Sequence, residues 1–339
     1  MQKPFLESGE KHFEYEVSVA RFDTTDLNRP ELLGNAGGNR AIAVLLFCPK
    51  SKETVRNQEH PQAIKHKLPL LLFNHGYCSS MEANTYLCSE IAANGYYVAS
   101  IGHPYESTLV EFEDGTRIEC DETIQSKLRG KEMWKALRMQ KNKMKSMETE
   151  EEKADLFDAF QDEYATFLKE RVREWSSDSV CALKEIKSRY GDLVDFSRGV
   201  AASGHSYGGA VALDLCLTKE EISCGLNMDG LLFGNHKGIY LQKPFYHMCC
   251  EGNLDLASQL FVKRRAPLYL AEFRNMKHAG FTDMKAQMPD SPMVGKLSFE
   301  VVHRTMVEAH VSFLDKYLKG KDVSVNQSIH PDVRISVYE

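Results

Sequence analysis

The sequence predicts an α/β fold in which a mostly parallel central sheet is flanked by helices. Two observations lead to this prediction. Short apolar segments typical of buried strands alternate with amphipathic segments typical of helices. A serine between glycines, at 204–208, joins one such strand to one such helix. The chain has 339 residues, 42% hydrophobic and 27% charged, which excludes a disordered or collagen-like protein. We expect a single domain over residues 1–339.

The first hundred residues provide a strand, a helix and a further strand at the centre of the predicted sheet. Strand-like residues concentrate in segments 12–20, 41–48, 67–73 and 96–101, with a turn at 35–39. Segment 67–73 is continuously apolar, as in a strand buried on both faces. Ser79 and Glu82 match a capping box, so a helix is expected to begin there and to stop at Gly95.

A charged segment then interrupts the alternation for about ninety residues. Residues 129–145 contain 7 basic and 1 acidic side chains, and residues 148–163 contain 8 acidic and 1 basic. Apolar residues recur at helical spacing in both halves, which predicts two amphipathic helices. A solvated helical insertion is the simplest interpretation. Two alternatives are a helical cap over an active site, at about 120–190, and a Met- and Lys-rich contact with a membrane interface.

The alternation resumes after this insertion. Strands are expected at 199–203, 222–228, 245–250 and 267–273. A helix at 298–319, stopped by Gly320, closes the predicted domain. The last nineteen residues fit either an additional strand or a loose tail.

The segment Gly204-His205-Ser206-Tyr207-Gly208 matches the G-x-S-x-G nucleophile elbow. A strand precedes it, and the helix that follows begins with small residues, as a sharp strand-to-helix turn requires. Ser206 is therefore the predicted nucleophile, in an α/β-hydrolase fold.

A serine nucleophile needs a base and an acid, which in this fold follow the serine in the order acid, then histidine. His278 follows a predicted strand by a short loop and is the expected base. His303 and His310 lie within the last helix, and His60 and His66 precede the sheet core.

The acid has three candidates: Asp229 comes directly after the strand at 222–228, and Glu251 and Asp255 come after the strand at 245–250. Asp229, 23 residues beyond Ser206, is favoured. Glu251 and Asp255 remain alternatives, because many members of the fold place the carboxylate after the next strand.

Two backbone N–H groups are expected to bind the oxygen that becomes negative when an ester is attacked. By analogy with the fold, they belong to Tyr207, after the nucleophile, and to Tyr77, after the strand that ends in Asn74-His75-Gly76. The alternative for the second position is an ordinary strand-ending turn.

Composition and charge exclude several other classes. A net charge of −6 disfavours nucleic-acid binding, and no apolar run reaches the ~20 residues of a membrane-spanning helix. No secretory signal is recognisable, so a cytoplasmic location is expected. The 9 cysteines fit reduced thiols, and neither a zinc site nor any cofactor is predicted. No oligomeric state is predicted.

Three segments carry a resemblance to the serine-dependent platelet-activating factor acetylhydrolases, the plasma and type II group of the α/β-hydrolase superfamily. They are FNHGYCSSMEANTYLCSEIAANGYYVASIGHP, VAASGHSYGGAVALDLC, and CGLNMDG followed by RNMKHAGFTD. The resemblance spans roughly residues 40–320. It implies that Ser206, Asp229 and His278 form a catalytic triad. It also implies calcium-independent hydrolysis of esters with short or oxidised acyl chains, commonly at the sn-2 position of phospholipids.

The sequence therefore predicts a serine hydrolase that cleaves a small-molecule ester or lipid through an acyl-enzyme on Ser206. The same triad also permits an amidase, a peptidase or an acyltransferase. A catalytically silent hydrolase fold that binds a ligand is the alternative from another class.

Overall fold

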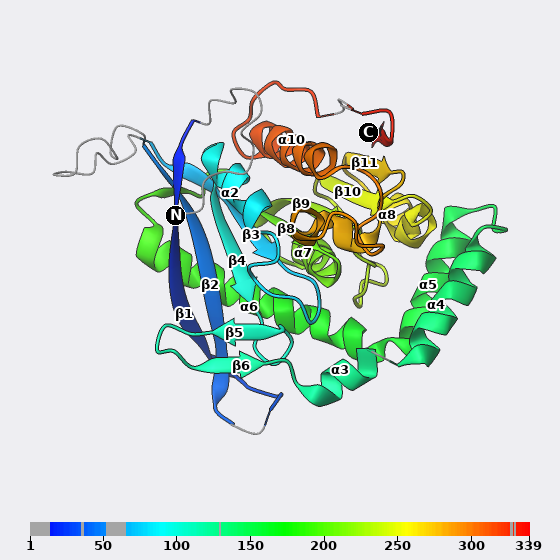
Figure 1. Cartoon of the computed structure of the whole chain (residues 1–339), viewed down its shortest axis with the longest axis horizontal. Helices are drawn as coiled ribbons and strands as arrows, with labels where there is room; N and C mark the ends of the chain where they lie inside the picture. Colours follow the sequence, from blue (N-terminus) through cyan, green and yellow to red (C-terminus); the bar gives the residue numbers. More distant parts are fainter. Residues whose placement is uncertain (1–13, 35–36, 52–65, 129, 326–327, 329) are drawn as a thin grey trace.

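A computed structural model describes residues 14–34, 37–51, 66–128, 130–325, 328 and 330–339. Figure 1 shows a twisted sheet with helices on both sides and a pair of helices, α4 and α5, at the edge farthest from β1 and β2. Three sequence-based expectations lie outside the described residues: the first two positions of the strand at 12–20, part of the turn at 35–39, and His60.

The main sheet runs in the order β1-β2-β4-β3-β8-β9-β10-β11-β12. Neighbouring strands from β4 to β11 are parallel, while β1, β2 and β12 join antiparallel. The bounds are β1 Glu16–Pro30, β2 Asn39–Lys50, β3 Leu68–Asn74, β4 Tyr97–Gly102, β8 Val200–His205, β9 Ile222–Met228, β10 Phe245–Cys250, β11 Leu268–Phe273 and β12 Val333–Tyr338. Strand β7 (Val194–Asp195) pairs with β3, and β5 (Leu109–Glu111) pairs with β6 (Arg117–Glu119).

Each face of the sheet has its own apolar core, because successive side chains of a strand point to opposite faces. On β2, Ile42, Val44 and Leu46 pack with helices α6 (Thr166–Tyr190) and α7 (Tyr207–Thr218). The alternate residues of β2 pack on the other face with α2 (Thr85–Ala93) and α10 (Phe299–Tyr317). Every residue of β3 is buried, as the continuously apolar segment predicts.

The short helices lie near the carboxyl ends of the strands or in the loops that follow them. They are η1 (Leu254–Ala257), α8 (Ser258–Lys263), η2 (His278–Phe281) and α9 (Met284–Gln287). None of the helices in the described part of the chain has both the length and the apolar character needed to cross a bilayer.

In its described residues, which omit only residue 129, the charged insertion forms four helices, so the prediction of two was wrong. They are α3 (Glu122–Leu128), α4 (Lys131–Met144), α5 (Glu150–Tyr164) and α6. A capping box starts α5: Thr149 accepts from the Glu152 N–H, and the Glu152 side chain returns to the Thr149 N–H. Ala165, at φ −133°, separates α5 from α6, so one apolar periodicity is divided between two helices.

The predicted start of α2 was also wrong. The helix begins at Thr85 after Asn84, and not at Ser79. The Ser79 N–H donates to the Gly76 carbonyl in a turn, and the Glu82 carboxylate pairs with Arg21, 3.1 Å away. Glu82 is therefore held by another partner. The C-terminal segment, left open between strand and tail, forms β12 against β11.

Candidate active site

The predicted elbow is a strand, a strained serine and a helix. Ser206 lies between β8 and α7 with φ 55° and ψ −123°, a conformation that costs energy for a side chain with a Cβ atom. Its N–H donates to the Met228 carbonyl at 2.8 Å. Close packing allows no side chain at the two flanking glycines. A Cβ at Gly204 would lie 2.3 Å from the Gly208 backbone, and one at Gly208 would lie 2.0 Å from the Asn74 carbonyl oxygen.

Ser206, His278 and Asp229 come together in one hydrogen-bonded chain. His278 Nε2 lies 2.8 Å from Ser206 Oγ, and His278 Nδ1 lies 2.8 Å from Asp229 Oδ2. The three residues come from the elbow, from the loop after β9 and from the loop after β11. The carboxyl ends of these parallel strands lie at the same edge of the sheet, which is why residues 72 positions apart can meet.

The Asp229 carboxylate is buried and fully hydrogen-bonded. Its Oδ1 accepts from the Cys250 N–H and from Asn253 Nδ2, both at 2.9 Å. Burial alone would raise the pKa of Asp229, but the contacts with His278, Asn253 and Cys250 outweigh it and hold the pKa below its ordinary value. The group therefore remains an anion beside the imidazole.

The two alternative acids have other partners. Glu251 is 61% exposed, and its nearest cation is Arg274, with Oε1 and Nε 3.9 Å apart. Asp255 accepts from Lys153 Nζ at 2.8 Å, which ties it to helix α5. Of the three candidates after β9 and β10, the structure brings Asp229 to the imidazole.

The two predicted oxyanion residues flank Ser206. Tyr207 is the first residue of α7, where a backbone N–H has no partner within the helix. Tyr77 follows Gly76, and a Cβ at Gly76 would lie 3.2 Å from the Ser206 Cβ, so this turn runs directly beside the serine. The rings of Tyr77 and Tyr207 meet edge to face at 4.8 Å.

The sequence analysis missed three residues that support the hydrogen-bonded chain of Ser206, His278 and Asp229. His205 Nε2 lies 3.1 Å from the His278 carbonyl oxygen, and burial lowers the pKa of His205 to about 3, so this imidazole is neutral and can anchor the histidine loop. Asn253 holds Asp229, and Lys141 Nζ in turn donates to Asn253 Oδ1 at 2.6 Å. No local motif marks these contacts; only the position of His205 within the elbow could have identified it.

A cavity of about 890 Å³ opens onto Ser206 and His278. Its walls are mainly apolar and include Leu231, Phe233 and Leu256. The insertion contributes Trp134, Leu137, Arg138 and Lys141 from helix α4 and Leu168 from α6. The volume lies in the range of small-molecule sites.

Among the described residues, no group of three or more His, Cys, Asp or Glu side chains could hold a metal ion. The two histidines of helix α10 contact residues outside this site. His310 lies between Ser203 Oγ and the Met306 carbonyl, and His303 lies 3.0 Å from Glu90.

Comparisons with known proteins identify distant relatives of this chain. A platelet-activating factor acetylhydrolase of Cavia porcellus is 24% identical over 285 residues, which is 79% of this chain and 61% of that protein. A probable 1-alkyl-2-acetylglycerophosphocholine esterase of Arthroderma benhamiae is 23% identical over 198 residues, 58% of this chain and 40% of that protein. The chain thus spans less than two thirds of the length of both relatives.

A solved structure supports the fold over the full length. A ferulic acid esterase from Streptomyces cinnamoneus superposes with a TM-score of 0.74, at 19% identity, and covers 97% of this chain and 98% of its own. The predicted α/β-hydrolase fold is therefore confirmed. Residues 32–251 match the family described as platelet-activating factor acetylhydrolase, isoform II, and the chain belongs to that family.

Proposed function

We propose that this protein is a serine carboxylic-ester hydrolase, with Ser206 as nucleophile, His278 as base and Asp229 as the acid that orients the imidazole. The single observation that carries the proposal is the hydrogen-bonded chain from Ser206 Oγ through His278 to a buried carboxylate, at a cavity wall. A serine hydroxyl is a weak nucleophile, and this arrangement is what activates it.

The proposed reaction has two halves. Ser206 Oγ attacks the ester carbonyl carbon while His278 Nε2 takes the hydroxyl proton, and Asp229 stabilises the imidazolium that results. The Tyr77 and Tyr207 N–H groups donate to the carbonyl oxygen as it becomes negative. The tetrahedral intermediate collapses, His278 gives its proton to the leaving alcohol, and the acyl group remains on Ser206. Water then attacks this acyl-enzyme with His278 again as base.

The proposed substrates are esters with short or modified acyl chains, among them lipids. One relative is named as an acetylhydrolase of platelet-activating factor, and the other as a probable esterase of 1-alkyl-2-acetylglycerophosphocholine. The cavity combines an apolar wall with two cations, Arg138 and Lys141, on helix α4. Apolar surface fits acyl or alkyl carbon, and the cations fit a phosphate or another anionic group on the same molecule.

We further propose that helices α3, α4 and α5 act as a cap that shapes this cavity. Gln125 of α3 and four residues of α4 form part of its wall. We also propose that this cap contacts a lipid interface, where the enzyme would meet a lipid ester.

The deciding experiment measures turnover of p-nitrophenyl acetate and p-nitrophenyl butyrate by the wild type and by Ser206→Ala. We expect turnover by the wild type and loss of at least ~10³-fold in the variant, because the acyl-enzyme can no longer form. Equal rates in both proteins would defeat the proposal.

Two companion measurements separate the alternatives. A fluorophosphonate probe labels an activated serine, so a silent binding module would leave the wild type unlabelled. A panel of esters, amides and acyl acceptors, followed by mass spectrometry, distinguishes a hydrolase of esters from an amidase or an acyltransferase.

A further inference from the structure

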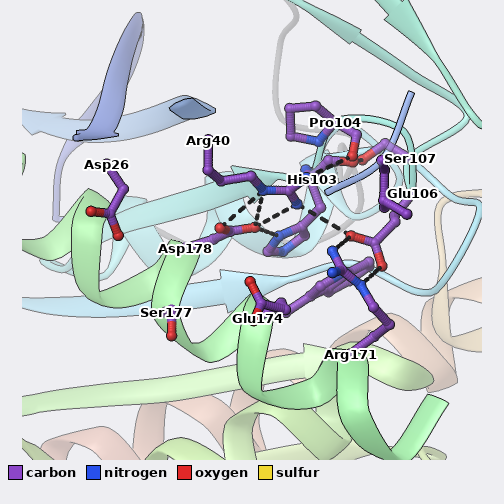
Figure 2. Close-up of polar contacts among 12 residues, drawn as sticks. Asp26, Arg40, His103, Pro104, Glu106, Ser107, Arg171, Glu174, Ser177 and Asp178 are labelled. Atoms are coloured by element: carbon purple, nitrogen blue, oxygen red, sulfur yellow. Dashed lines mark hydrogen bonds and ion pairs between the residues drawn. The ribbon is translucent and has the colours of Figure 1, made fainter. Parts of the chain in front are cut away.

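A buried cluster of charged side chains lies behind the turn that carries Tyr77. Arg40 of β2 bridges Asp178 of α6 and Glu106 of the loop after β4, at 2.8 and 3.2 Å (Figure 2). Arg171 of α6 binds the same Glu106 carboxylate through Nε at 2.9 Å and through a second nitrogen (Figure 2). The Glu106 and Asp178 side chains are wholly buried, and Arg40 and Arg171 are only 2% and 8% exposed, so the four charged groups are almost completely shielded from solvent.

Stability alone explains such a cluster poorly. Two carboxylates and two guanidinium groups lose their hydration when they are buried, and their mutual attraction often does no more than offset that loss. Well-packed apolar side chains would serve as well for stability. A cluster of this kind is better explained when its fixed geometry positions a neighbouring group.

The neighbouring group is the Tyr77 side chain. Its Oη donates to Glu106 Oε1 at 2.6 Å, and burial together with Glu106 raises the pKa of the Tyr77 phenol, so the proton stays on the oxygen. The ring stacks on Trp175 of α6 with centroids 5.4 Å apart and an angle of 10°. The backbone beyond it is tied to the same loop, since the Cys78 N–H donates to the Glu106 carbonyl at 2.8 Å.

The beginning of the turn is attached to the same helix. Asn74 Oδ1 accepts from Ser179 Oγ at 3.0 Å and lies 3.0 Å from His103 Nε2, while His103 Nδ1 lies 2.8 Å from Asp178. Helix α6 therefore holds residues at both ends of the 74–77 turn. It does so through residues 171, 175, 178 and 179, which share one face of the helix by their spacing.

We propose that Glu106, clamped by Arg171 and Arg40, is a positioning residue that holds Tyr77 so that its backbone N–H is aimed at the oxyanion. The inference rests on the proposed function, and it assigns to helix α6 a role in transition-state binding beyond that of a cavity wall. A backbone N–H stabilises the transition state only if it is already in place when negative charge develops on the carbonyl oxygen. A small displacement of this N–H therefore lowers kcat rather than substrate affinity.

Tyr77→Phe is the sharpest test, because it removes the hydroxyl and keeps both the ring and the backbone N–H. Tyr96→Phe is the matched control: Tyr96 is buried, where Tyr77 is partly buried, and it likewise donates to a carboxylate, Asp315 Oδ1, at 2.5 Å, on the α10 side of the sheet. Both variants lose one tyrosine–carboxylate hydrogen bond. They differ in whether the lost bond touches the 74–77 turn.

Three quantities are measured for each protein: kcat and KM for p-nitrophenyl butyrate, and the inhibition constant of an alkyl trifluoromethyl ketone. Ser206 Oγ adds to the carbonyl carbon of the ketone, and the carbonyl oxygen becomes an oxyanion. The inhibition constant of the ketone therefore reports on how tightly the enzyme binds the transition state. For Tyr77→Phe we expect kcat and ketone affinity to fall together by about ten-fold, with KM within about two-fold, since removal of a whole oxyanion donor costs ~10²–10³. Tyr96→Phe should match the wild type in all three.

Two results would overturn the inference: unchanged kcat and ketone affinity in Tyr77→Phe, or equal losses in both variants. Glu106→Gln is a second test and should also lower kcat and ketone affinity. If Glu106→Gln does not fold, Tyr77→Phe alone decides the test. Failure of the proposed function can be distinguished from failure of this inference. In the first case the wild type would neither turn over esters nor be labelled by a fluorophosphonate.

Discussion

Replacing Asp229 with asparagine changes one carboxylate oxygen to an NH₂ group and leaves the shape of the side chain the same. The carboxylate accepts from His278 Nδ1–H on Oδ2, and from the Cys250 N–H and Asn253 Nδ2 on Oδ1. The backbone N–H of Cys250 cannot become an acceptor, so the asparagine oxygen has to remain on that side. The new NH₂ group then points at His278.

The consequence is a change of histidine tautomer. An NH₂ group can only donate to His278 Nδ1, which must then be unprotonated, and the imidazole hydrogen moves to Nε2. Nε2 lies 2.8 Å from Ser206 Oγ and can no longer accept the hydroxyl proton. Loss of the base in this way costs about 10⁴-fold in kcat in serine proteases, and we expect a similar loss here. At ~1.4 kcal/mol per factor of ten, this is roughly 5.5 kcal/mol of activation free energy.

The assay compares kcat for p-nitrophenyl butyrate among Asp229→Asn, Glu251→Gln and Asp255→Asn. The last two are matched controls, because each neutralises a carboxylate near the site. Both of these carboxylates have cationic partners and no hydrogen bond to His278 among the described contacts, so we expect kcat within about two-fold of the wild type. A variant Asp229→Asn that kept kcat within about ten-fold, or a large loss in Glu251→Gln, would refute the assignment.

Three further predictions concern residues around the site and the fold. Asn253→Ala removes one of the two donors on Asp229 Oδ1, so kcat should fall by about ten-fold, and steady-state kinetics that match the wild type would contradict this. Burial raises the pKa of Asp283 from 3.8 to about 7, so the native state retains a proton that the unfolded chain releases. The free energy of unfolding should therefore fall by about 4 kcal/mol at most between pH ~4 and ~7. Urea titrations of Asp283→Asn should show a smaller fall over the same pH range. An equal fall in the variant and the wild type would refute the raised pKa of Asp283. Thr149→Ala removes the N-cap of α5 and should cost about 1 kcal/mol by denaturant titration, with no change if the cap is irrelevant to stability.

The sheet could be predicted from sequence because burial on both faces leaves a direct signature. Strands β9 and β10 have the bounds that were expected, and β3 differs by one residue at each end. Helix starts were harder, since a capping box needs both side chains to be available. The Thr149 and Glu152 pair forms one, whereas Glu82 pairs with Arg21 of β1, 61 positions away, which a local pattern does not reveal.

The site could be predicted in part for a related reason. The order of serine, acid and histidine follows from the order of the strands, so Ser206, Asp229 and His278 could be selected without coordinates. Their supporting residues could not. Lys141 meets Asn253 across 112 positions, and Arg40 meets Asp178 across 138. Arg171 and Asp178 belong to a charged helix, and charges on a helix usually indicate a solvated face.

These long-range contacts divide the insertion into two parts with different physical roles. Helix α4 borders the cavity and reaches Asp229 through Lys141 and Asn253. Helix α6 packs on the sheet with Trp175 in its core, and it holds the Tyr77 turn through Arg171 and Glu106. A separable cap would therefore end before Thr166, where α6 begins. Removal of α3 to α5 should widen the cavity and change which molecules fit in it. Removal of α6 would expose one face of the sheet and also release the 74–77 turn. On the proposed function, helix α4 thus provides most of the insertion's share of the cavity wall, whereas helix α6 adds Leu168 to that wall and holds the Tyr77 turn.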